Sequence, residues 1–348
     1  MPESLITTSP ASPAELVWNA RLAGMDGHLL QSWAWGEFKS RHGWLPERIL
    51  IEDTAGVAMA QVLYRTQWGA SVGYIPRGPV FAGNTEVLWN LLIDALDDRA
   101  RQHRAILTLI EPNAPLGLAG DYRSHDVVAG PGHLQPGRTV RIPLGDDEAI
   151  LKQMHQKTRY NVRLAQRRGV TVERHCAEPA ALDTFYALMK DTSERNEFGI
   201  HARDYYADFM AQFGDDAVLL FARLDSGALA AVLIAATFGE EGIYMYGASS
   251  TQHRADGAAF LMQFDAMRWA RDRGCTSYDL WGIPDEDPDS VQTDGPGAIA
   301  GTRGDDWRGL YRFKTGFGGE IVSYPPVVER RHVPLLPWLA RKLNVIKG

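Results

Sequence analysis

One pattern occurs twice along this chain of 348 residues, and the repetition limits its fold more than any other feature. Each copy has an apolar, strand-like run, a loop, an amphipathic stretch with helical spacing and a second apolar run. The apolar runs lie at 71–75 and 105–110 in the first copy, and at 242–246 and 277–281 in the second. This order is typical of a crossover between parallel strands. The sequence therefore predicts a duplicated α/β protein.

Two flanking features extend this pattern. An apolar, hairpin-like stretch precedes each copy, at 49–64 and at 217–238. At roughly 150 residues per domain, the length of the chain agrees with two domains. We place the boundary between them near the sequence PLGDD at 143–147.

The composition argues against several classes of protein. No run of about 18 apolar residues occurs, so we expect no membrane-spanning helix. The first residues, MPESLITT, lack the basic segment and apolar core of a secretory signal. The two cysteines, Cys176 and Cys275, are too few for a disulfide framework or a cysteine-rich zinc site, and the ten histidines are scattered singly. We therefore expect a cytoplasmic protein without a metal centre.

The net charge of −7 is unevenly distributed. Between Lys152 and Arg174, seven basic residues stand against one acidic residue, Glu173, so this stretch carries +6 and the rest of the chain carries −13. The apolar residues within it predict a helix that ends at Gly169. Two interpretations stay open. The stretch is either a solvated helix face or a ridge that binds phosphates, since Lys and Arg attract polyanions whatever the total charge.

Three further segments have weaker signatures. The sequence RADGAA at 254–259 is similar to the pyrophosphate loop of GNAT acyl-CoA transferases, although a plain helix N-terminus explains it about as well. The stretch at 284–306, rich in Asp, Gly and Pro, is predicted to be a surface loop, either a lid or a plain insertion. The basic amphipathic tail at 333–343 is predicted to dock on the first domain rather than on a membrane.

Six segments, taken in order, resemble the FemABX family of peptidoglycan bridge-forming aminoacyltransferases. The resemblance runs from about residue 31 to residue 324. The segments join aromatic residues to Lys, Arg or Gly, and each one alone could be structural. They are QSWAWGEFK (31–39), YIPRGP (74–79), KTRYNVR (157–163), TSERNEF (192–198), YMYGASS (244–250) and LYRFKTGFGG (310–319).

This resemblance implies an α/β fold of two GNAT-like domains in tandem, with mixed sheets, flanking helices and a last segment that returns to the first domain. We accordingly expect a first domain of residues 1–145 plus 317–348, which binds the acceptor, and a second of residues 146–316, with the catalytic and tRNA contacts. The implied donor is an aminoacyl-tRNA that carries glycine, alanine or serine. The implied acceptor is a UDP-MurNAc-peptide or lipid II, with peripheral contact at the inner face of the membrane. We expect no cofactor, a monomer, and the compact form of the family without a helical arm.

The resemblance also implies roles for single residues. Lys314 and Phe313 match the reacting centre, where Lys314 would stabilise the oxyanion or the tRNA 3′ end. Lys39 matches a contact to the acceptor diphosphate, and Arg203 is expected to supply a second cation. Glu111, before a proline, is the candidate general base, with the acceptor's own groups as the alternative. The remaining candidates are Tyr74, Arg77 and Tyr246 for the peptide groove, and Lys157, Arg159, Arg163, Arg167 and Arg168 for tRNA.

Two other functions stay open. The turn at 254–259 favours a GNAT-type N-acyltransferase that uses an acyl-CoA. The second alternative is a non-catalytic protein that binds tRNA or a cell-wall precursor.

Overall fold

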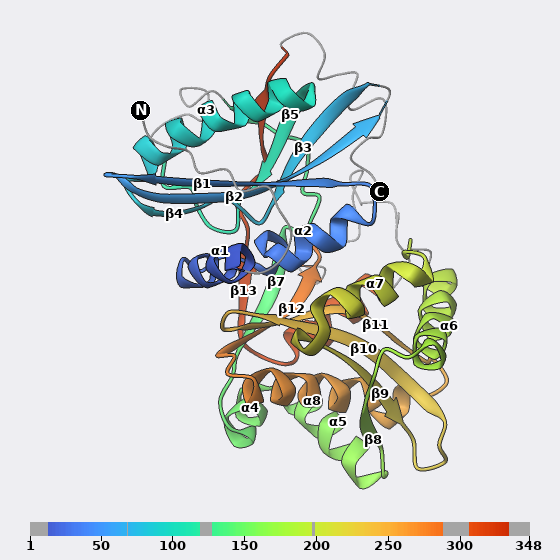
Figure 1. The fold of residues 1–348 in the computed structure, drawn as a ribbon. Helices are drawn as coiled ribbons and strands as arrows, with labels where there is room; N and C mark the ends of the chain where they lie inside the picture. The colour runs from blue at the N-terminus through green and yellow to red at the C-terminus, as the bar shows by residue number, and fades with distance from the viewer. Residues whose placement is uncertain (1–12, 68, 119–126, 197–198, 288–305, 334–348) are drawn as a thin grey trace, which may run out of the picture. The chain divides into compact units, whose positions relative to one another are not determined.

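The computed structural model of this chain describes residues 13–67, 69–118, 127–196, 199–287 and 306–333 (Figure 1). The chain divides into two units. The first consists of Met1–Gln135 and Tyr324–Gly348, and the second of Pro136–Ser323. Each unit contains one seven-stranded mixed sheet with helices on its faces. The predicted fold class, α/β with mixed sheets and flanking helices, is therefore confirmed.

The sheet of the first unit has the strand order β1-β2-β3-β5-β14-β6, with β4 paired to β2. Its strands are β1 (Leu45–Asp53), β2 (Gly56–Gln67), β3 (Ala70–Pro76), β4 (Val80–Gly83), β5 (Ala105–Glu111), β6 (Val128–Ala129) and β14 (Val328–Arg331). Its helical elements are α1 (Pro13–Gly24), η1 (Leu29–Gln31), α2 (Trp33–Ser40) and α3 (Thr85–His103). Strands β3 and β5 are parallel, which confirms the first predicted crossover.

The alternation of side chains along β1 explains why the first sheet is covered on both faces. Ile49 and Ile51 are buried in the core that α3 forms with the sheet. Arg48, directly before Ile49, points the other way because successive side chains alternate, and its guanidinium donates to the carbonyl of Trp33 in α2. Figure 1 accordingly shows α3 on one face of this sheet and α2 on the other.

The sheet of the second unit has the strand order β13-β7-β12-β11-β10-β9-β8. Its strands are β7 (Arg138–Pro143), β8 (Thr171–His175), β9 (Ala217–Arg223), β10 (Leu229–Phe238), β11 (Glu241–Ser249), β12 (Ser277–Ile283) and β13 (Glu320–Ser323). Its helical elements are α4 (Asp147–Gln153), α5 (Gln156–Arg167), α6 (Pro179–Asn196), α7 (Arg203–Phe213), η3 (Gly214–Asp216), η4 (Arg254–Asp256), α8 (Ala258–Asp272) and α9 (Asp306–Thr315). Strands β11 and β12 are parallel, as the second predicted crossover requires.

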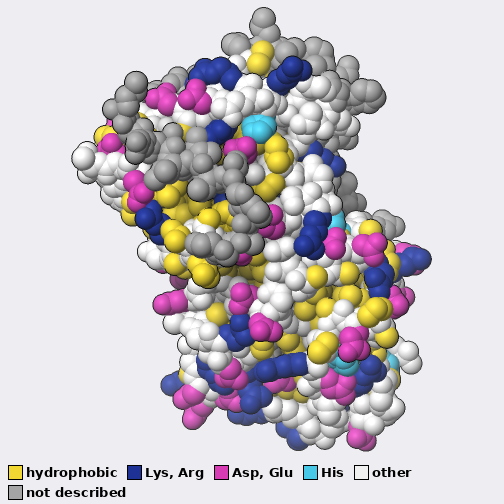
Figure 2. Space-filling model, in the orientation of Figure 1, with side chains coloured by type: hydrophobic (Ala, Val, Ile, Leu, Met, Phe, Trp, Pro, Cys, Tyr) yellow, Lys and Arg dark blue, Asp and Glu magenta, His cyan; other side chains and the backbone are white. Residues whose placement is uncertain are grey.

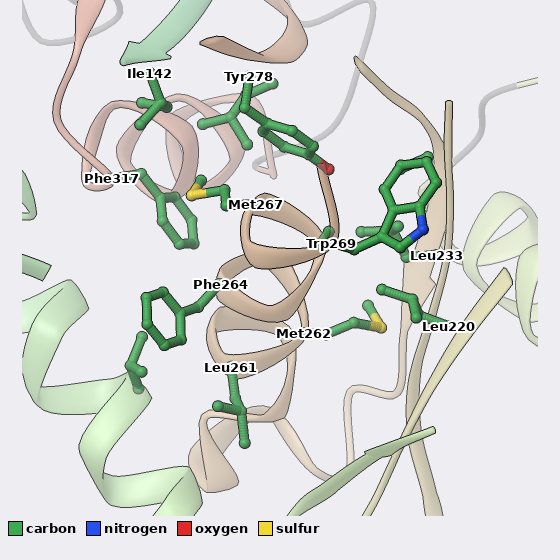
Figure 3. Packing of buried hydrophobic residues seen from close by; sticks show 14 of the residues in the cluster. Ile142, Leu220, Leu233, Leu261, Met262, Phe264, Met267, Trp269, Tyr278 and Phe317 are labelled. Atoms are coloured by element: carbon green, nitrogen blue, oxygen red, sulfur yellow. The ribbon is translucent and has the colours of Figure 1, made fainter. Parts of the chain in front are cut away.

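Helix α8 forms the centre of the core of the second unit (Figure 3). Met262 points towards Leu220 of β9, and Met267 lies beside Ile142 of β7 and Phe317. Fully burying one such side chain contributes about 1.5–3 kcal/mol to folding. Figure 1 shows α4, α5 and α8 on one face of this sheet and α6 and α7 on the other.

Two boundaries in the structure differ from the predicted ones. Strands β7 and β13 pair with each other in the second sheet, and β7 also pairs with β12, whereas the sequence placed both with the first domain. The basic stretch forms two helices, α4 and α5, instead of the single one predicted. The break follows from the extended backbone of Met154 (ψ 144°), after which α5 begins again at Gln156.

Most of the predicted loop at 284–306 and almost all of the tail at 333–343 lie outside the described residues. Within the described ranges, no helix is both long and apolar enough to cross a membrane.

A partly buried polar network fixes the last strand of the first unit. The guanidinium of Arg330 on β14 donates to both carboxylate oxygens of Asp97 on α3, at 3.0 and 2.5 Å. His332 bridges the same carboxylate and the hydroxyl of Thr108 on β5, at 2.9 Å each. Burial opposes the charge of Asp97, but the hydrogen bonds from Arg330 and His332 outweigh it and lower its pKa.

We expect Asp97→Asn to lower the free energy of unfolding by about 2 kcal/mol at pH 7, because hydrogen bonds to a charged group are lost. A carboxyl whose pKa falls on folding stabilises the protein above its ordinary value of 3.8, and this contribution disappears as the pH falls through the folded-state pKa. Urea denaturation at pH 7 and at pH 3 measures both effects. Asp98→Asn, at an exposed neighbour, is the control, and equal losses in the two variants would contradict the network's role.

Candidate active site

In the second unit, the parallel strands β11 and β12 pair at one end and then separate; we call the point of separation the fork. Strands β11 and β12 pair only where Glu241–Ile243 lies beside Ser277–Asp279. Lys314, in the last turn of α9, lies where this pairing ends. Its Nζ donates to the carbonyl of Gly282 on β12 at 2.8 Å and lies 5.3 Å from the ring centroid of Tyr244 on β11. The fork therefore holds an amine between its two diverging strands.

The Lys314 amine is unusual because it is only 5% exposed. Burial lowers its pKa to about 7, and the negative charge of Asp279 acts in the opposite direction. An ordinary lysine, with a pKa near 10.5, is fully charged at neutral pH. Lys314 instead changes its protonation state close to neutrality, so it can act as a cation there or lose its proton.

Glycines after Lys314 allow α9 to end against other backbone. The carbonyl of Gly316 accepts the N–H of His155, which immediately precedes α5, at 2.9 Å. A Cβ added at Gly316 would lie 2.4 Å from the hydroxyl of Thr158, and one at Gly318 would lie 2.3 Å from the carbonyl of Gln153. These contacts are too close for a side chain. The glycines of the segment at 310–319 therefore hold the end of α9 on the junction of α4 and α5.

The ring of Phe313 packs edge-on against Phe260, at 4.9 Å, and against Phe317, at 5.3 Å. It thus lies in the core contact between α9 and α8. The structure gives the side chain a packing role, and its predicted place at the reacting centre stays a prediction.

A bulge in β11 separates Tyr244 from Tyr246. Tyr244 pairs with Ala235 and Tyr246 with Ile234, so Met245 is the extra residue. Tyr244 consequently shares the face of the α8 core, near Lys314, whereas Tyr246 packs edge-on against Tyr206 and other aromatic rings of α7. In a regular strand, Tyr244 and Tyr246 would point to the same face, because they are two residues apart. Tyr244, which the sequence analysis did not select, is the tyrosine beside Lys314.

The first unit has a separate group of cations and aromatic rings. Lys39, in the last turn of α2, is 9% exposed, and its Nζ lies 5.8 Å from the ring centroid of Trp44. The guanidinium carbon of Arg65 on β2 lies 5.4 Å from the same centroid. Burial and, to a smaller extent, the charge of Arg65 lower the pKa of Lys39 to about 8. Two like charges beside one ring favour an anionic ligand between them.

Tyr74 and Glu111 belong to a buried network at the carboxyl ends of β3 and β5. The Tyr74 hydroxyl donates to the Glu111 carboxylate at 2.5 Å. The backbone N–H groups of Leu134 and Gln135 donate to the same carboxylate at 3.2 and 3.1 Å. Burial, reinforced by the charge of Glu111, raises the pKa of Tyr74 well above its ordinary value. Glu111 has no exposed surface and anchors residues 134–135, a geometry that does not favour its predicted role as general base.

Two predicted substrate-binding arginines have structural contacts. Arg77 is 1% exposed, and its guanidinium lies 3.4 Å from the ring centroid of Tyr324. Arg203 begins α7 and donates to the carboxylate of Asp183 at 2.5 Å and to the carbonyl of Pro179 at 3.1 Å, which fixes α7 on α6. Their roles towards a substrate stay predictions, and a substrate would have to compete with these contacts.

The predicted tRNA-binding residues of α5 fall into two groups. Arg159 donates to three carbonyls at the end of α4, and Arg168 donates to the carbonyl of Ala255 and the carboxylate of Asp256. The other three form no ion pair with a described carboxylate and are exposed. They are Lys157, Arg163 and Arg167. Arg167 lies 5.7 Å from the ring centroid of Tyr160, which is itself 55% exposed.

The wider surface near α5 carries both signs of charge. Figure 2 shows Lys and Arg side chains interspersed with Asp and Glu over the part of this face where Figure 1 draws α4, α5 and α8. Several of these charges pair with each other, as Arg268 and Arg271 do with Asp147. On the outer face of α5, by contrast, the exposed ring of Tyr160 lies beside Arg167, which pairs with no described carboxylate.

The GNAT-like turn at 254–259 lies at the N-terminus of α8, as its sequence suggests, but α5 lies against its Gly257. Gly257 has a positive φ of 74°, and a Cβ there would lie 2.5 Å from the carbonyl of Asn161 on α5. Arg168 contacts the same turn. A pyrophosphate group at this helix end would meet the backbone of α5.

Four residues of these sites escaped the sequence analysis: Trp44, Arg65, Tyr244 and Asp279. Tyr244 and Asp279 lie in strands with bulges, and Trp44, directly before β1, comes close to Arg65 through the pairing of β1 with β2. Among the residues that the structure describes, no group of three His, Cys, Asp or Glu side chains could hold a metal ion.

Known proteins resemble this chain over most of its length. A lipid II:glycine glycyltransferase of Staphylococcus saprophyticus subsp. saprophyticus is 27% identical over 348 aligned residues, which cover 76% of this chain and 82% of that protein. The protein of the same name from Staphylococcus aureus is 26% identical over 351 aligned residues, with the same two coverages.

Solved structures share the fold. The crystal structure of FemX superposes with a TM-score of 0.80 at 23% identity and covers 97% of this chain and 99% of its own. A tandem GNAT protein from the clavulanic acid biosynthesis pathway has a TM-score of 0.53 at 11% identity, with coverages of 95% and 99%. The expectation of two GNAT-like units in tandem is thereby confirmed.

A family model matches nearly the whole sequence. The model of the FemAB family matches residues 23–124, 133–229 and 225–328, which together span most of the chain and include both candidate sites. This protein belongs to the FemAB family.

Proposed function

We propose that this protein transfers an aminoacyl group from an aminoacyl-tRNA to the side-chain amine of a peptidoglycan stem peptide. The observation that carries the proposal is the buried Lys314 amine at the fork of β11 and β12. The names of the curated relatives, which are lipid II:glycine glycyltransferases, support the same reaction class.

We assign the acceptor to the first unit. A lipid- or UDP-linked precursor carries a diphosphate, and Lys39 with Arg65 beside Trp44 offers two cations to such an anion. The guanidinium can bind phosphate oxygens in a bidentate manner, whereas the ammonium acts as a point charge. Arg65 takes the place in this proposal that the sequence analysis gave to Arg203, since Arg203 is occupied by Asp183.

We assign the donor to the second unit. The amine of the acceptor attacks the ester carbonyl of the aminoacyl-tRNA, a C–N bond forms, and the C–O bond to the ribose breaks. The proton of the amine leaves, and the ribose oxygen takes one up. In its protonated form, Lys314 stabilises the oxyanion of the tetrahedral intermediate, an effect typically of about 3–4 kcal/mol.

The attacking amine itself must be neutral. An unperturbed lysine-like amine has a pKa near 10.4, so only about one molecule in 10³ is neutral at pH 7. Glu111 is buried and fully engaged, which favours the alternative that groups of the acceptor assist deprotonation.

An acyl-CoA donor is the second candidate, and the structure of the turn at 254–259 disfavours it. The pyrophosphate of a CoA would need the N-terminus of α8, where the carbonyl of Asn161 and the side chain of Arg168 already lie. The exposed cations of α5 instead suit the phosphates of an RNA, whose contacts depend on charge rather than on sequence.

Incubation of the purified chain with a lipid-linked or UDP-linked stem peptide tests the donor. We expect label to move from aminoacyl-tRNA to the acceptor and none to move from an acyl-CoA, because the pyrophosphate of a CoA would meet the carbonyl of Asn161 at Gly257. Scintillation counting of the isolated acceptor measures the transfer. Transfer from the CoA thioester alone would contradict the proposal, and binding of both substrates without transfer would support the non-catalytic alternative.

Replacing Arg163 and Arg167 by Gln should weaken tRNA binding and flatten its salt dependence. Each lost phosphate contact reduces the slope of log K against log salt by about one. Filter binding from 50 to 300 mM salt, roughly the range in which such contacts are sensitive, measures the slope. The matched control is Lys190→Gln with Arg195→Gln, which removes two charges from α6. An unchanged slope in the α5 variant would contradict the proposed phosphate contacts and would favour the alternative that α5 has only a solvated face.

A further inference from the structure

Strand β12 contains a bulge directly beside Lys314. Asp279 pairs with Arg141 and Gly282 with Thr139, so two residues of β12 lie opposite one residue of β7. Trp281, within the bulge, has a positive φ of 60°. A non-glycine residue in this left-handed region costs on the order of 1–3 kcal/mol, so neighbouring contacts must hold it there.

The side chain of Asp279 supplies these contacts. Asp279 has no exposed surface, and its carboxylate accepts the backbone N–H of Trp281 at 2.6 Å. The same oxygen accepts the hydroxyl of Thr139, which is 1% exposed. The carboxylate thus holds the backbone of the bulge in place through Trp281 and links it to Thr139 of β7.

The closed bulge determines where the next carbonyl points. Gly282 follows Trp281, and its carbonyl accepts the hydrogen bond from Lys314 at 2.8 Å. A Cβ at Gly282 would lie 2.5 Å from the ring of Pro136, so the backbone here has little room to move. Opening the bulge would displace the acceptor of the Lys314 amine.

Charge gives Asp279 a second link to Lys314. Beside the amine lie Asp279 on β12 and Tyr244 on β11. Burial raises the pKa of Tyr244 to about 12, so this phenol is neutral near pH 7. The negative charge of Asp279 favours the ammonium form of Lys314, against the effect of burial.

We propose that Asp279 is a positioning residue for Lys314, acting through the bulge of β12 and through its negative charge. The inference rests on the proposed function only where Lys314 is taken to stabilise an oxyanion. Asp279 does not touch the reacting atoms in this account. It places the amine and keeps it cationic.

Asp279→Asn tests the charge in the free protein. Its expected effect is a fall of about one pH unit in the titration midpoint of Lys314, because a nearby negative charge is removed. NMR of ¹³C-labelled lysine, with the Lys314 signal assigned by its loss in Lys314→Arg, measures the midpoint. An unchanged midpoint would overturn the proposal. This readout needs no substrate, so it separates failure of the positioning role from failure of the proposed aminoacyl transfer.

The pH profile of turnover separates positioning from a merely structural role. A midpoint lowered by one unit from about 7 predicts a turnover about fivefold lower at pH 7 for Asp279→Asn. This deficit narrows as the pH falls, because the ammonium is restored. A deficit of equal size at every pH would assign Asp279 to the fold alone.

A second pair of variants keeps the proposal testable if Asp279→Asn does not fold. Thr139→Val removes the hydroxyl that holds the carboxylate, whereas Thr139→Ser retains it. We expect Thr139→Val to move the Lys314 signal and to lower kcat about tenfold with an unchanged acceptor KM, and Thr139→Ser to resemble the parent protein. Equal behaviour of the two variants would contradict the role of the bulge.

Discussion

Burial of the Lys314 amine is the constraint on which the second unit depends. Removing an ammonium from water is unfavourable unless hydrogen bonds and opposite charge replace the lost solvent. The carbonyl of Gly282 and the ring of Tyr244 contact the amine, and Asp279 provides the charge. The glycines after Lys314 hold the end of α9 against α4 and α5. The bulges of β11 and β12 and the glycines at the end of α9 thus all determine the surroundings of the Lys314 side chain.

The first unit contains a different arrangement of cations. Lys39 and Arg65 repel each other beside Trp44, and part of the cost is visible in the lowered pKa of Lys39. An anion that binds there would relieve the repulsion and replace lost solvation. A protein that places like charges together in partly buried surroundings gives up some stability for binding.

The sequence predicted those features that follow from periodicity. Both parallel crossovers and both hairpins were found because apolar residues recur with the period of a strand or a helix. The bulges of β11 and β12 were missed, since one extra residue leaves no signature in composition. The resemblance selected Tyr246, and only the bulge of β11 shows that Tyr244 is the tyrosine on the side of Lys314. The placement of β7 and β13 was missed because the pairs that β7 forms with β12 and β13 join residues far apart in the sequence.

The sequence also pointed to individual charged residues but could not show which groups they contact. Lys314 and Lys39 were selected from the family resemblance, and the structure adds that both side chains are buried. Arg159, Arg168 and Arg203 were assigned to ligands from their charge and the family resemblance, but each contacts a carbonyl or carboxylate of its own unit. An arginine that caps a helix and one that binds a phosphate look the same in a sequence. Only the neighbouring backbone distinguishes them.

We propose that the first unit binds the acceptor and that the second unit carries the residues that act on the donor ester. Steady-state kinetics of Arg65→Gln and Lys314→Met, measured side by side with aminoacyl-tRNA and the acceptor peptide, test it most directly. We predict that Arg65→Gln raises the acceptor KM about tenfold with little change in kcat, and that Lys314→Met lowers kcat about 10²-fold or more with little change in that KM. A Lys314→Met enzyme with normal kcat, or an Arg65→Gln enzyme with a normal KM, would contradict it.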